Sequence, residues 1–430
     1  MYTPETYRTR LIDKKINLYL QATGAISLTG MRFVGKTTTG QAHCKSEISL
    51  ADSRNNFSNR TLAQASPDYV LKGEYPRLID EWQEVLPIWD AVRFACDSTP
   101  ENGHFILTGS SIANFESSEI FHSGTGRIAT LQMSSMTLLE TGDSSGDVSL
   151  EDMFNKPTPM IPLGKVNLDD LVRYCVRGGW PKTIDSPIEI AHITPTEYIK
   201  TLAEKDFNSL PSMKNKRSPQ KIMAVLTTMA KAESSISGAS EISKSLKESY
   251  EIAISRQTMD AYIDAFRHLF IIEDQKAYTL PGGTTGGKLL KSPKLRFADP
   301  SLVVAALGLR PGMLVEDMET FGKVFDCLCV HELRIYAESI DAQIYHLLEG
   351  HGSISADAVV ELKDGRIGLF KHRVGAHQID EAAAGLLKAK KFLENSGKSP
   401  SMLCVVCGMA DAVYTRPDGV IVTPLTALKP

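Results

Sequence analysis

Long apolar segments are missing from this chain of 430 residues. Runs such as residues 302–307 are far shorter than the roughly 20 apolar residues that a membrane-spanning helix needs. The opening stretch, MYTPETYRTRLIDKK, carries charges where a secretory signal peptide has an apolar core. We therefore expect a cytoplasmic protein that makes no contact with a membrane.

Cysteine is scarce as well. The chain has seven cysteines, an odd number without dense spacing, which argues against a framework of disulfide bonds. Cys404 and Cys407 form a Cys-x-x-Cys pair, but a zinc site needs a second pair of ligands and the sequence shows none nearby. We expect both to be core residues of a buried strand.

An excess of positive charge is also lacking. The chain has 47 Lys and Arg against 51 Asp and Glu, so its overall charge does not indicate nucleic acid binding. What is present is the composition of a globular protein, with 42% hydrophobic and 23% charged residues. The length predicts about two or three domains.

The segment LTGMRFVGKTTT, residues 28–39, has the spacing of a phosphate-binding loop. In such a loop the backbone N–H groups surround the phosphates of ATP, the lysine reaches the outer phosphates and the hydroxyl after it binds Mg²⁺. A chance match in a glycine-containing turn is the alternative. The expected nucleotide contacts are Gly30, Met31, Arg32, Phe33, Val34, Gly35, Lys36, Thr37 and Thr38, with Thr37 also a ligand of Mg²⁺.

The surroundings of this loop favour an α/β fold. A phosphate-binding loop needs a strand before it and a helix after it, and residues 25–30 are apolar while 37–45 contain no proline. Further apolar runs alternate with helix-permissive segments, which is typical of parallel β/α units. The expected strands are residues 25–30, 46–52, 76–81, 104–111 and 129–135.

Two acidic residues end the third of these runs. Asp80 and Glu81 follow Leu78 and Ile79. Hydrolysis at a phosphate loop needs one carboxylate for Mg²⁺ and one to activate water, usually at the end of a neighbouring strand. We predict that Asp80 serves Mg²⁺ and Glu81 the water. Thr108 and Ser110 end the next run and are candidates to hydrogen-bond that water or the γ-phosphate; an ordinary turn is equally compatible with them.

The motifs LTGMRFVGKTT, LIDEWQ and ILTGSS, in this order, resemble a prokaryotic family of AAA-like P-loop ATPases with a C-terminal domain of unknown function. The resemblance continues through GTGRIATLQMSSMTLLE, GGWP, KSPKLRFADPSL, GKVFDCLCVHEL and GVIVTPLTAL. The family typically has Gln where this chain has Phe33, and Leu-Pro-Leu where this chain has SSMTL. The resemblance therefore implies a divergent member. The resemblance implies that Arg127 meets a γ-phosphate, in cis or from a neighbouring subunit; a surface arginine is the alternative.

We expect four parts: a P-loop ATPase domain (1–140), a linker with a helical, lid-like segment (141–213), a winged helix (214–300) and a PD-(D/E)xK-like domain (301–430). In 214–296, 14 Lys and Arg stand against 8 Asp and Glu, a surplus that DNA binding favours. Arg256 and Gln257 are candidates for base edges and Arg267 for a phosphate. A protein partner or a second copy of the chain is the alternative occupant.

The last part resembles a nuclease core that has lost its chemistry. Asp357 fills the place of the first metal ligand, but Leu369 stands where a Glu precedes Lys371 in the Glu-x-Lys pattern. Because Mg²⁺ needs several fixed oxygens, we expect no cleavage. Glu361 and Lys363 also match the pattern, yet they follow Asp357 on the same strand.

Together these features predict Mg²⁺-dependent ATP binding and hydrolysis that drives a regulatory or DNA-associated switch. The alternatives are an ATP-gated nuclease and a nucleotide-binding interaction protein with little turnover.

Overall fold

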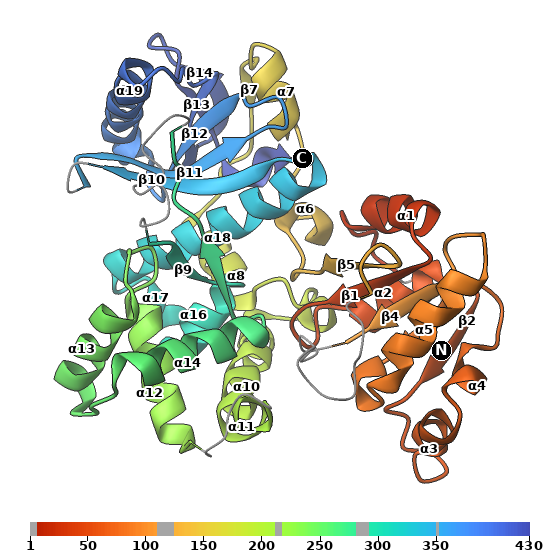
Figure 1. Cartoon of the computed structure of the whole chain (residues 1–430). Helices are drawn as coiled ribbons and strands as arrows, with labels where there is room; N and C mark the ends of the chain where they lie inside the picture. The colour runs from red at the N-terminus through yellow and green to blue at the C-terminus, as the bar shows by residue number, and fades with distance from the viewer. Residues whose placement is uncertain (1–6, 110–123, 211–216, 281–291, 350–351) are drawn as a thin grey trace. The chain divides into compact units, whose positions relative to one another are not determined.

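The computed structural model describes residues 7–109, 124–210, 217–280, 292–349 and 352–430 (Figure 1). The chain forms two compact units. The first comprises residues 1–135 and 268–270, and the second comprises residues 136–267 and 271–430. The first boundary lies five residues before the predicted one, and the three later parts fall within one unit, whose division into domains stays a prediction.

A five-stranded parallel sheet forms the centre of the first unit. Its strands are β1 (Ala25–Thr29), β2 (Ser46–Ser49), β3 (Arg77–Asp80), β4 (Phe105–Thr108) and β5 (Ile128–Gln132), in the order β2-β3-β4-β1-β5. Four of them lie within segments that the sequence predicted as strands, and β5 begins one residue before the predicted segment 129–135. The parallel pairing confirms the α/β class, and it brings the carboxyl ends of all five strands to one edge.

Helices cover both faces of this sheet. They are α1 (Asp13–Ala22), α2 (Lys36–His43), α3 (Ser58–Ala65), α4 (Pro67–Leu71) and α5 (Pro87–Ser98), with a 3₁₀ turn η2 (Trp82–Glu84). Neighbouring strand residues point to opposite faces. Leu78 packs with Ile16 of α1, whereas Ile79 packs with Trp89 of α5. Strands that are apolar on both faces are typical of a buried parallel sheet.

Helices dominate the first part of the second unit. They are α6 (Leu138–Thr141), α7 (Leu150–Asn155), α8 (Leu168–Arg177), η3 (Pro181–Thr183), α9 (Ile188–Ala191), α10 (Ile193–Thr201), the π-helix η4 (Leu202–Asp206), α11 (Phe207–Ser209), α12 (Pro219–Lys231), α13 (Ala239–Tyr250), α14 (Arg256–His268), α16 (Pro300–Leu307) and α17 (Pro311–Leu314). Strands β8 (Ile272–Gln275) and β9 (Lys294–Phe297) pair antiparallel after α14. Three helices followed by a strand pair is the order that the sequence predicted for this segment.

A mixed sheet closes the second unit. Its order is β10-β11-β12-β13-β15-β14-β7, and helices α18 (Met318–Ser339) and α19 (Ile379–Asn395) pack against it. The strands are β7 (Ile161–Pro162), β10 (Gln343–Glu349), β11 (Ile354–Glu361), β12 (Ile367–Arg373), β13 (Met402–Cys407), β14 (Ala412–Thr415) and β15 (Ile421–Thr423), and the remaining elements are β6 (Val148–Ser149), β16 (Leu428–Lys429), η6 (Ala376–Gln378) and η7 (Leu425–Ala427).

All seven cysteines are free thiols. Cys404 and Cys407 are buried in β13, as predicted for core residues. Among the described residues, none of the helices is both long and apolar enough to cross a membrane.

Candidate functional site

The loop between β1 and α2 is wound by three residues with positive φ. Gly30 has φ 142°, Phe33 has φ 67° and Gly35 has φ 98°. A Cβ on Gly30 would lie 2.2 Å from the carbonyl oxygen of Met133, so only glycine fits there. The strand, loop and helix that a phosphate-binding loop requires are thus all present.

Lys36 begins α2 and lies folded over this loop. Its side chain is only 7% exposed, and its Nζ donates to the carbonyl oxygens of Gly30 (2.9 Å) and Met31 (2.6 Å). Burial lowers the pKa of Lys36 to about 8, although the nearby Glu81 acts to raise it. The ammonium group is therefore held at the loop by carbonyl oxygens, a position from which it can pair with a phosphate.

Asp80 is the meeting point of three hydroxyl groups. Thr37 Oγ1 and Thr108 Oγ1 each donate to Asp80 Oδ1 at 2.7 Å, and Ser49 Oγ donates to Oδ2 at 3.2 Å. The parallel register places Ser49 and Thr108 directly beside Asp80, at the carboxyl edge of the sheet. The structure therefore brings Thr37, Asp80 and Thr108 together, as the sequence predicted, and adds Ser49. The hydroxyl of Thr37 and the carboxylate of Asp80 are oxygen ligands that suit Mg²⁺.

Glu81 follows Asp80 in a left-handed conformation, with φ 54°. Burial raises the pKa of its carboxyl group, and Gln83 Nε2 donates a hydrogen bond to Glu81 Oε2. The other end of the Gln83 amide, Oε1, is buried without a partner among the described residues. Gln83 thus holds the carboxylate of Glu81 in place. Gln83 belongs to the motif LIDEWQ, but we did not predict this role for it.

Arg10 is a further residue that sequence reasoning missed. Its guanidinium is buried and donates to the carbonyl oxygen of Val34 in the loop (2.9 Å) and to that of Ser134 (2.8 Å). These partners lie 24 and 124 positions away in the sequence. No local pattern marks such a contact, because only the fold brings the three segments together.

Arg127 does not lie beside the loop. It precedes β5 at the amino end of the strand, since Ile128 pairs with Ala25, and its Nε pairs with Asp97 at 2.7 Å on the surface. The loop follows the carboxyl end of β1, about 17 Å away at 3.3 Å per residue. The prediction that Arg127 meets the γ-phosphate in cis is therefore wrong, and contact from a neighbouring subunit stays a prediction. Ser110 lies outside the described residues.

Helix α14 carries the candidate DNA contacts. Ser255 Oγ accepts the backbone N–H of Thr258 (3.2 Å), so the predicted helix cap is present. Arg256 is well exposed and lies 3.9 Å from Asp260, whereas Arg267 pairs more closely with Asp264 (2.7 Å) and Asp274 (2.8 Å), so carboxylates compete with a phosphate at both positions. Lys294 and Arg296, two cations of the local surplus, are buried. The surface is therefore less basic than the sequence count indicates.

A bulge changes the position of Asp357 in the C-terminal sheet. Between Ala356 and Val359, three steps on β11 match two steps on β10. Asp357 Oδ2 accepts the backbone N–H of His372 (2.9 Å), and ligand atoms of Asp326, Asp357 and His372 lie within 4.8 Å of one another. We predicted neither Asp326 nor His372 as a neighbour.

Leu369 and Lys371, the residues at the Glu-x-Lys place, lie elsewhere. Leu369 is fully buried in the core with α19, and a Cβ on Gly385 of α19 would lie 2.8 Å from Lys371 Cε. Lys371 Nζ donates to Ser355 Oγ at 3.1 Å. The predicted loss of a metal-binding oxygen at Leu369 fits this apolar environment. The second match is also no site, because Lys363 pairs with Asp341 at 2.8 Å.

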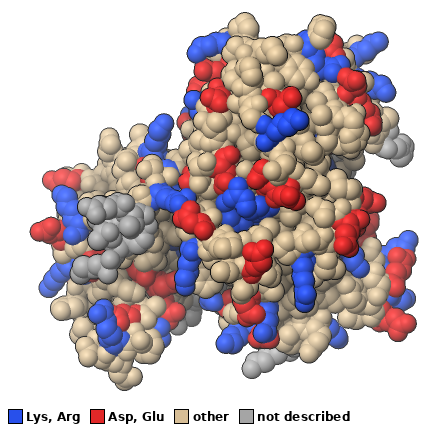
Figure 2. All heavy atoms as spheres, turned by 180° about the vertical axis from the view of Figure 1, so that it is seen from behind, with Lys and Arg blue, Asp and Glu red and all other residues tan. Residues whose placement is uncertain are grey.

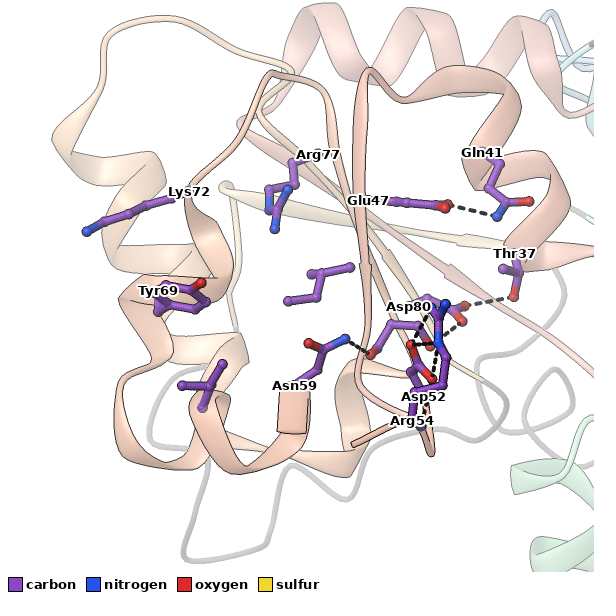
Figure 3. Close-up of a pocket in the computed structure, with 13 residues that line it drawn as sticks. Thr37, Gln41, Glu47, Asp52, Arg54, Asn59, Tyr69, Lys72, Arg77 and Asp80 are labelled. Carbon is purple, nitrogen blue, oxygen red and sulfur yellow. Dashed lines mark hydrogen bonds and ion pairs between the residues drawn. The ribbon is translucent and has the colours of Figure 1, made fainter. Parts of the chain in front are cut away.

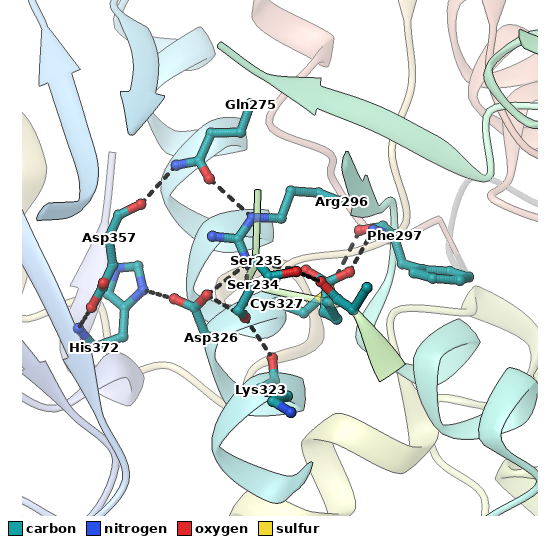
Figure 4. A network of polar contacts seen from close by, with 12 residues as sticks. Ser234, Ser235, Gln275, Arg296, Phe297, Lys323, Asp326, Cys327, Asp357 and His372 are labelled. Carbon is teal, nitrogen blue, oxygen red and sulfur yellow. Dashed lines mark hydrogen bonds and ion pairs between the residues drawn. The ribbon is translucent and has the colours of Figure 1, made fainter. Parts of the chain in front are cut away.

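Asp326 of α18 belongs to a buried ion-pair network (Figure 4). Arg296 Nη1 lies 2.6 Å from Asp326 Oδ2 and 3.0 Å from Glu233 Oε1, and His372 Nδ1 lies 2.6 Å from Asp326 Oδ1. Burial by itself raises the pKa of Asp326, but Arg296 and His372 together lower it well below its usual range. Arg296 thus already neutralises Asp326, and Arg373 Nη1 lies 3.3 Å from Asp357 Oδ2, so both carboxylates of the group have cationic partners.

Two family models match parts of the chain. Residues 22–141 match an AAA domain, and residues 168–312 match a domain of unknown function (DUF8612). The first unit therefore has the fold of an AAA-like P-loop ATPase, and the match supports ATP binding and hydrolysis as its general activity.

No curated protein gave a significant match. Among solved structures, the chain is similar to the Walker-type ATPase PABY2304 of Pyrococcus abyssi, with 14% identity, 71% of this chain and 97% of that chain covered, and a TM-score of 0.44. It is also similar to the Aeropyrum pernix Orc1 protein in complex with DNA (12% identity, 71% and 94% covered, TM-score 0.26). A third similar structure is the FIGL-1 AAA domain in complex with ADP, with 12% identity, 60% of this chain and 84% of that chain covered, and a TM-score of 0.27. Likenesses of this degree carry no argument about what this chain binds.

Proposed function

We propose that the chain is a Mg²⁺-dependent ATPase whose nucleotide state drives a regulatory or DNA-associated conformational switch. The observation that carries the proposal is the meeting of Thr37, Asp80 and Thr108 beside the loop at residues 30–38. The backbone N–H groups of that loop and Lys36 bind the phosphates, and Thr37 and Asp80 hold Mg²⁺. When bound, the ion offsets charge on the phosphates.

Glu81 is the proposed acceptor of the proton from the attacking water. Its raised pKa moves it closer to neutral pH, where a general base is most effective. Gln83 fixes its carboxylate, and the buried Lys36 stabilises negative charge that develops on the outer phosphate.

ATP hydrolysis by the purified chain tests this proposal. We expect phosphate release with Mg²⁺ and none when EDTA removes the ion, because Thr37 and Asp80 alone leave the phosphate charge uncompensated. Adding duplex DNA at constant salt separates a DNA-associated switch from a protein-directed one. Nucleotide binding without turnover under every condition would instead favour an interaction protein.

We further propose that α12, α13, α14 and the β8–β9 pair form a winged helix that contacts DNA through the start of α14. The support is the element order and the exposure of Arg256 and Gln257. Lys and Arg are interspersed with Asp and Glu on the face that Figure 2 displays. A protein partner or a second copy of the chain is the alternative occupant.

Replacing Arg256 with alanine is expected to weaken DNA binding and to reduce the slope of log K against log salt by about one. Arg267→Ala should have a smaller effect, since Asp264 and Asp274 already occupy its guanidinium. Fluorescence anisotropy with labelled duplex DNA measures both, and the exposed Arg310→Ala is the matched control. If the parent protein fails to bind at low salt, α14 contacts protein instead.

The C-terminal sheet is proposed not to cleave nucleic acid. Arg296 occupies Asp326, and Leu369 offers no oxygen where a second metal ligand belongs. Incubation with DNA or RNA and Mg²⁺ or Mn²⁺ should leave the substrate intact on a denaturing gel. Metal-dependent cleavage that disappears in Asp357→Ala would show a working nuclease.

A further inference from the structure

A cavity of about 470 Å³ lies beside β2 and β3 in the first unit (Figure 3). One end reaches Thr37 and Asp80, and the other is formed by Tyr69, Lys72 and Arg77. This volume is typical of pockets that hold a small molecule. Of the proposed nucleotide and Mg²⁺ residues, only Thr37 and Asp80 line it, at one end, so the end formed by Arg77 lies outside the loop site.

Arg77 is the unusual member of this lining. Its side chain is only 8% exposed, Nε donates to the carbonyl oxygen of Val70 (2.6 Å) and Nη1 donates to Ser46 Oγ (3.0 Å). Within the described part of the chain, no carboxylate pairs with the guanidinium and Nη2 has no hydrogen-bond partner. Figure 3 shows the group pointing into the cavity.

The surroundings are shaped to keep Arg77 in this position. A Cβ on Gly73 would lie 2.3 Å from Arg77 Nη1, so the absence of a side chain at Gly73 makes room for the guanidinium. Burial lowers the pKa of Arg77, yet an arginine remains charged at neutral pH. A buried cation without a counter-charge is costly, so a bound anion would relieve that cost.

The charges around the cavity are arranged by sign. Its carboxylates already have partners: Asp52 pairs with Arg54 (2.6 Å), Glu47 accepts from Gln41 Nε2 (2.7 Å), and Asp80 accepts hydrogen bonds from hydroxyl groups. Lys72, at the Arg77 end, is exposed and has no side-chain partner among the described residues, and in Figure 3 its side chain extends away from Arg77. Unpaired positive charge is therefore concentrated at one end.

We propose that this cavity is a binding site for a small anionic molecule whose carboxylate or phosphate group pairs with Arg77, while the exposed Lys72 adds a second positive charge at that end. Arg77 lies three positions before Asp80 on β3, about 10 Å along the strand, so the ligand does not compete for the place of the ATP phosphates. Planar guanidinium groups bind both carboxylates and phosphates through paired N–H donors. The site stands independently of whether the chain hydrolyses ATP.

Isothermal titration calorimetry with inorganic phosphate and, separately, with succinate tests the site and distinguishes the two anion classes. Both are titrated into full-length Lys36→Ala protein, which removes the phosphate affinity of the loop. In this Lys36→Ala protein, the additional substitution Arg77→Met should reduce the affinity for the anion by at least about tenfold, as expected when a charge-assisted pair is lost. Arg77→Lys should retain part of the affinity, since a lysine keeps the positive charge but lacks the paired N–H donors of the guanidinium group.

Lys72→Gln keeps the test decisive if Arg77→Met does not fold, because Lys72 is exposed. It should weaken binding, whereas Lys14→Gln, an exposed lysine of α1, should not. Failure of both anions to bind with a Kd below roughly 1 mM would overturn the proposal, as would binding that Lys72→Gln and Arg77→Met leave unchanged. Phosphate that binds wild type but not Lys36→Ala would belong to the loop and equally count against it.

Discussion

Glu81→Gln is expected to slow ATP hydrolysis by about 10²- to 10⁴-fold while leaving ATP affinity nearly unchanged, the range typical for loss of a general base. The amide keeps the size of Glu81 but cannot accept the proton from water. Phosphate release gives the rate, and fluorescence titration with a labelled ATP analogue gives the affinity. Lys36→Ala provides the contrast, because losing its ammonium should weaken binding as well as turnover.

The pH dependence provides a second readout for Glu81. Burial raises the pKa of its carboxyl group, so wild-type turnover should fall as the pH falls through that raised value and the base becomes protonated. Glu81→Gln should lack this acidic limb. Glu74→Gln, at an exposed acid in the same unit, serves as the matched control and should behave as wild type. Full activity of Glu81→Gln would remove this residue from the mechanism.

Arg296→Met is expected to cost the second unit about 3–5 kcal/mol of unfolding free energy, the range for breaking a buried ion pair on one side. Arg296 is 3% exposed and contacts both Glu233 and Asp326. Without it, two buried carboxylates lose the cation they share. Urea unfolding gives the free energy, and hydrogen exchange of peptides from β9, α18 and β12 shows whether the loss is local.

The penalty should also depend on pH with a definite sign. In wild type, Arg296 helps to depress the pKa of Asp326, so this stabilisation is present at neutral pH and is lost as the pH falls through the depressed value. In Arg296→Met both acids should bind protons more readily, so the deficit should be larger at pH 7 than at pH 5. The exposed Arg310→Met is the control. A deficit that does not change with pH would mean that lost packing, and not unpaired charge, causes it.

Local patterns were sufficient for the strand, loop and helix of the phosphate site in the first unit. The strand that carries Asp80, the loop at residues 30–38 and the helix after it were predicted because short-range rules govern them: an apolar run forms a buried strand, and glycines allow positive φ. The grouping of Thr37, Asp80 and Thr108 followed as well, since parallel strands bring their carboxyl ends to one edge.

The errors have identifiable physical causes. Arg127 ends the motif GTGR and directly precedes β5, and because β5 is parallel to β1, Arg127 lies at the amino edge of the sheet while the loop lies at the carboxyl edge. Arg267 and Arg296 counted as basic surplus, yet carboxylates neutralise both: Arg267 pairs with Asp264 and Asp274 nearby in the sequence, and Arg296 with Glu233 and Asp326, which are distant. Asp357 has other neighbours than predicted, because one bulge shifts the alternation of side chains along β11.

The sequence by itself thus determined the α/β class of the first unit, the phosphate loop and the acidic strand end, because each depends on neighbours within a few residues. Tertiary structure alone decided that Arg10 supports the loop, that Arg296 neutralises Asp326, and that Arg77 faces a cavity without a counter-charge. Long-range electrostatic pairing and the space around a buried cation depend on which segments the fold brings together, and no spacing in the chain records that.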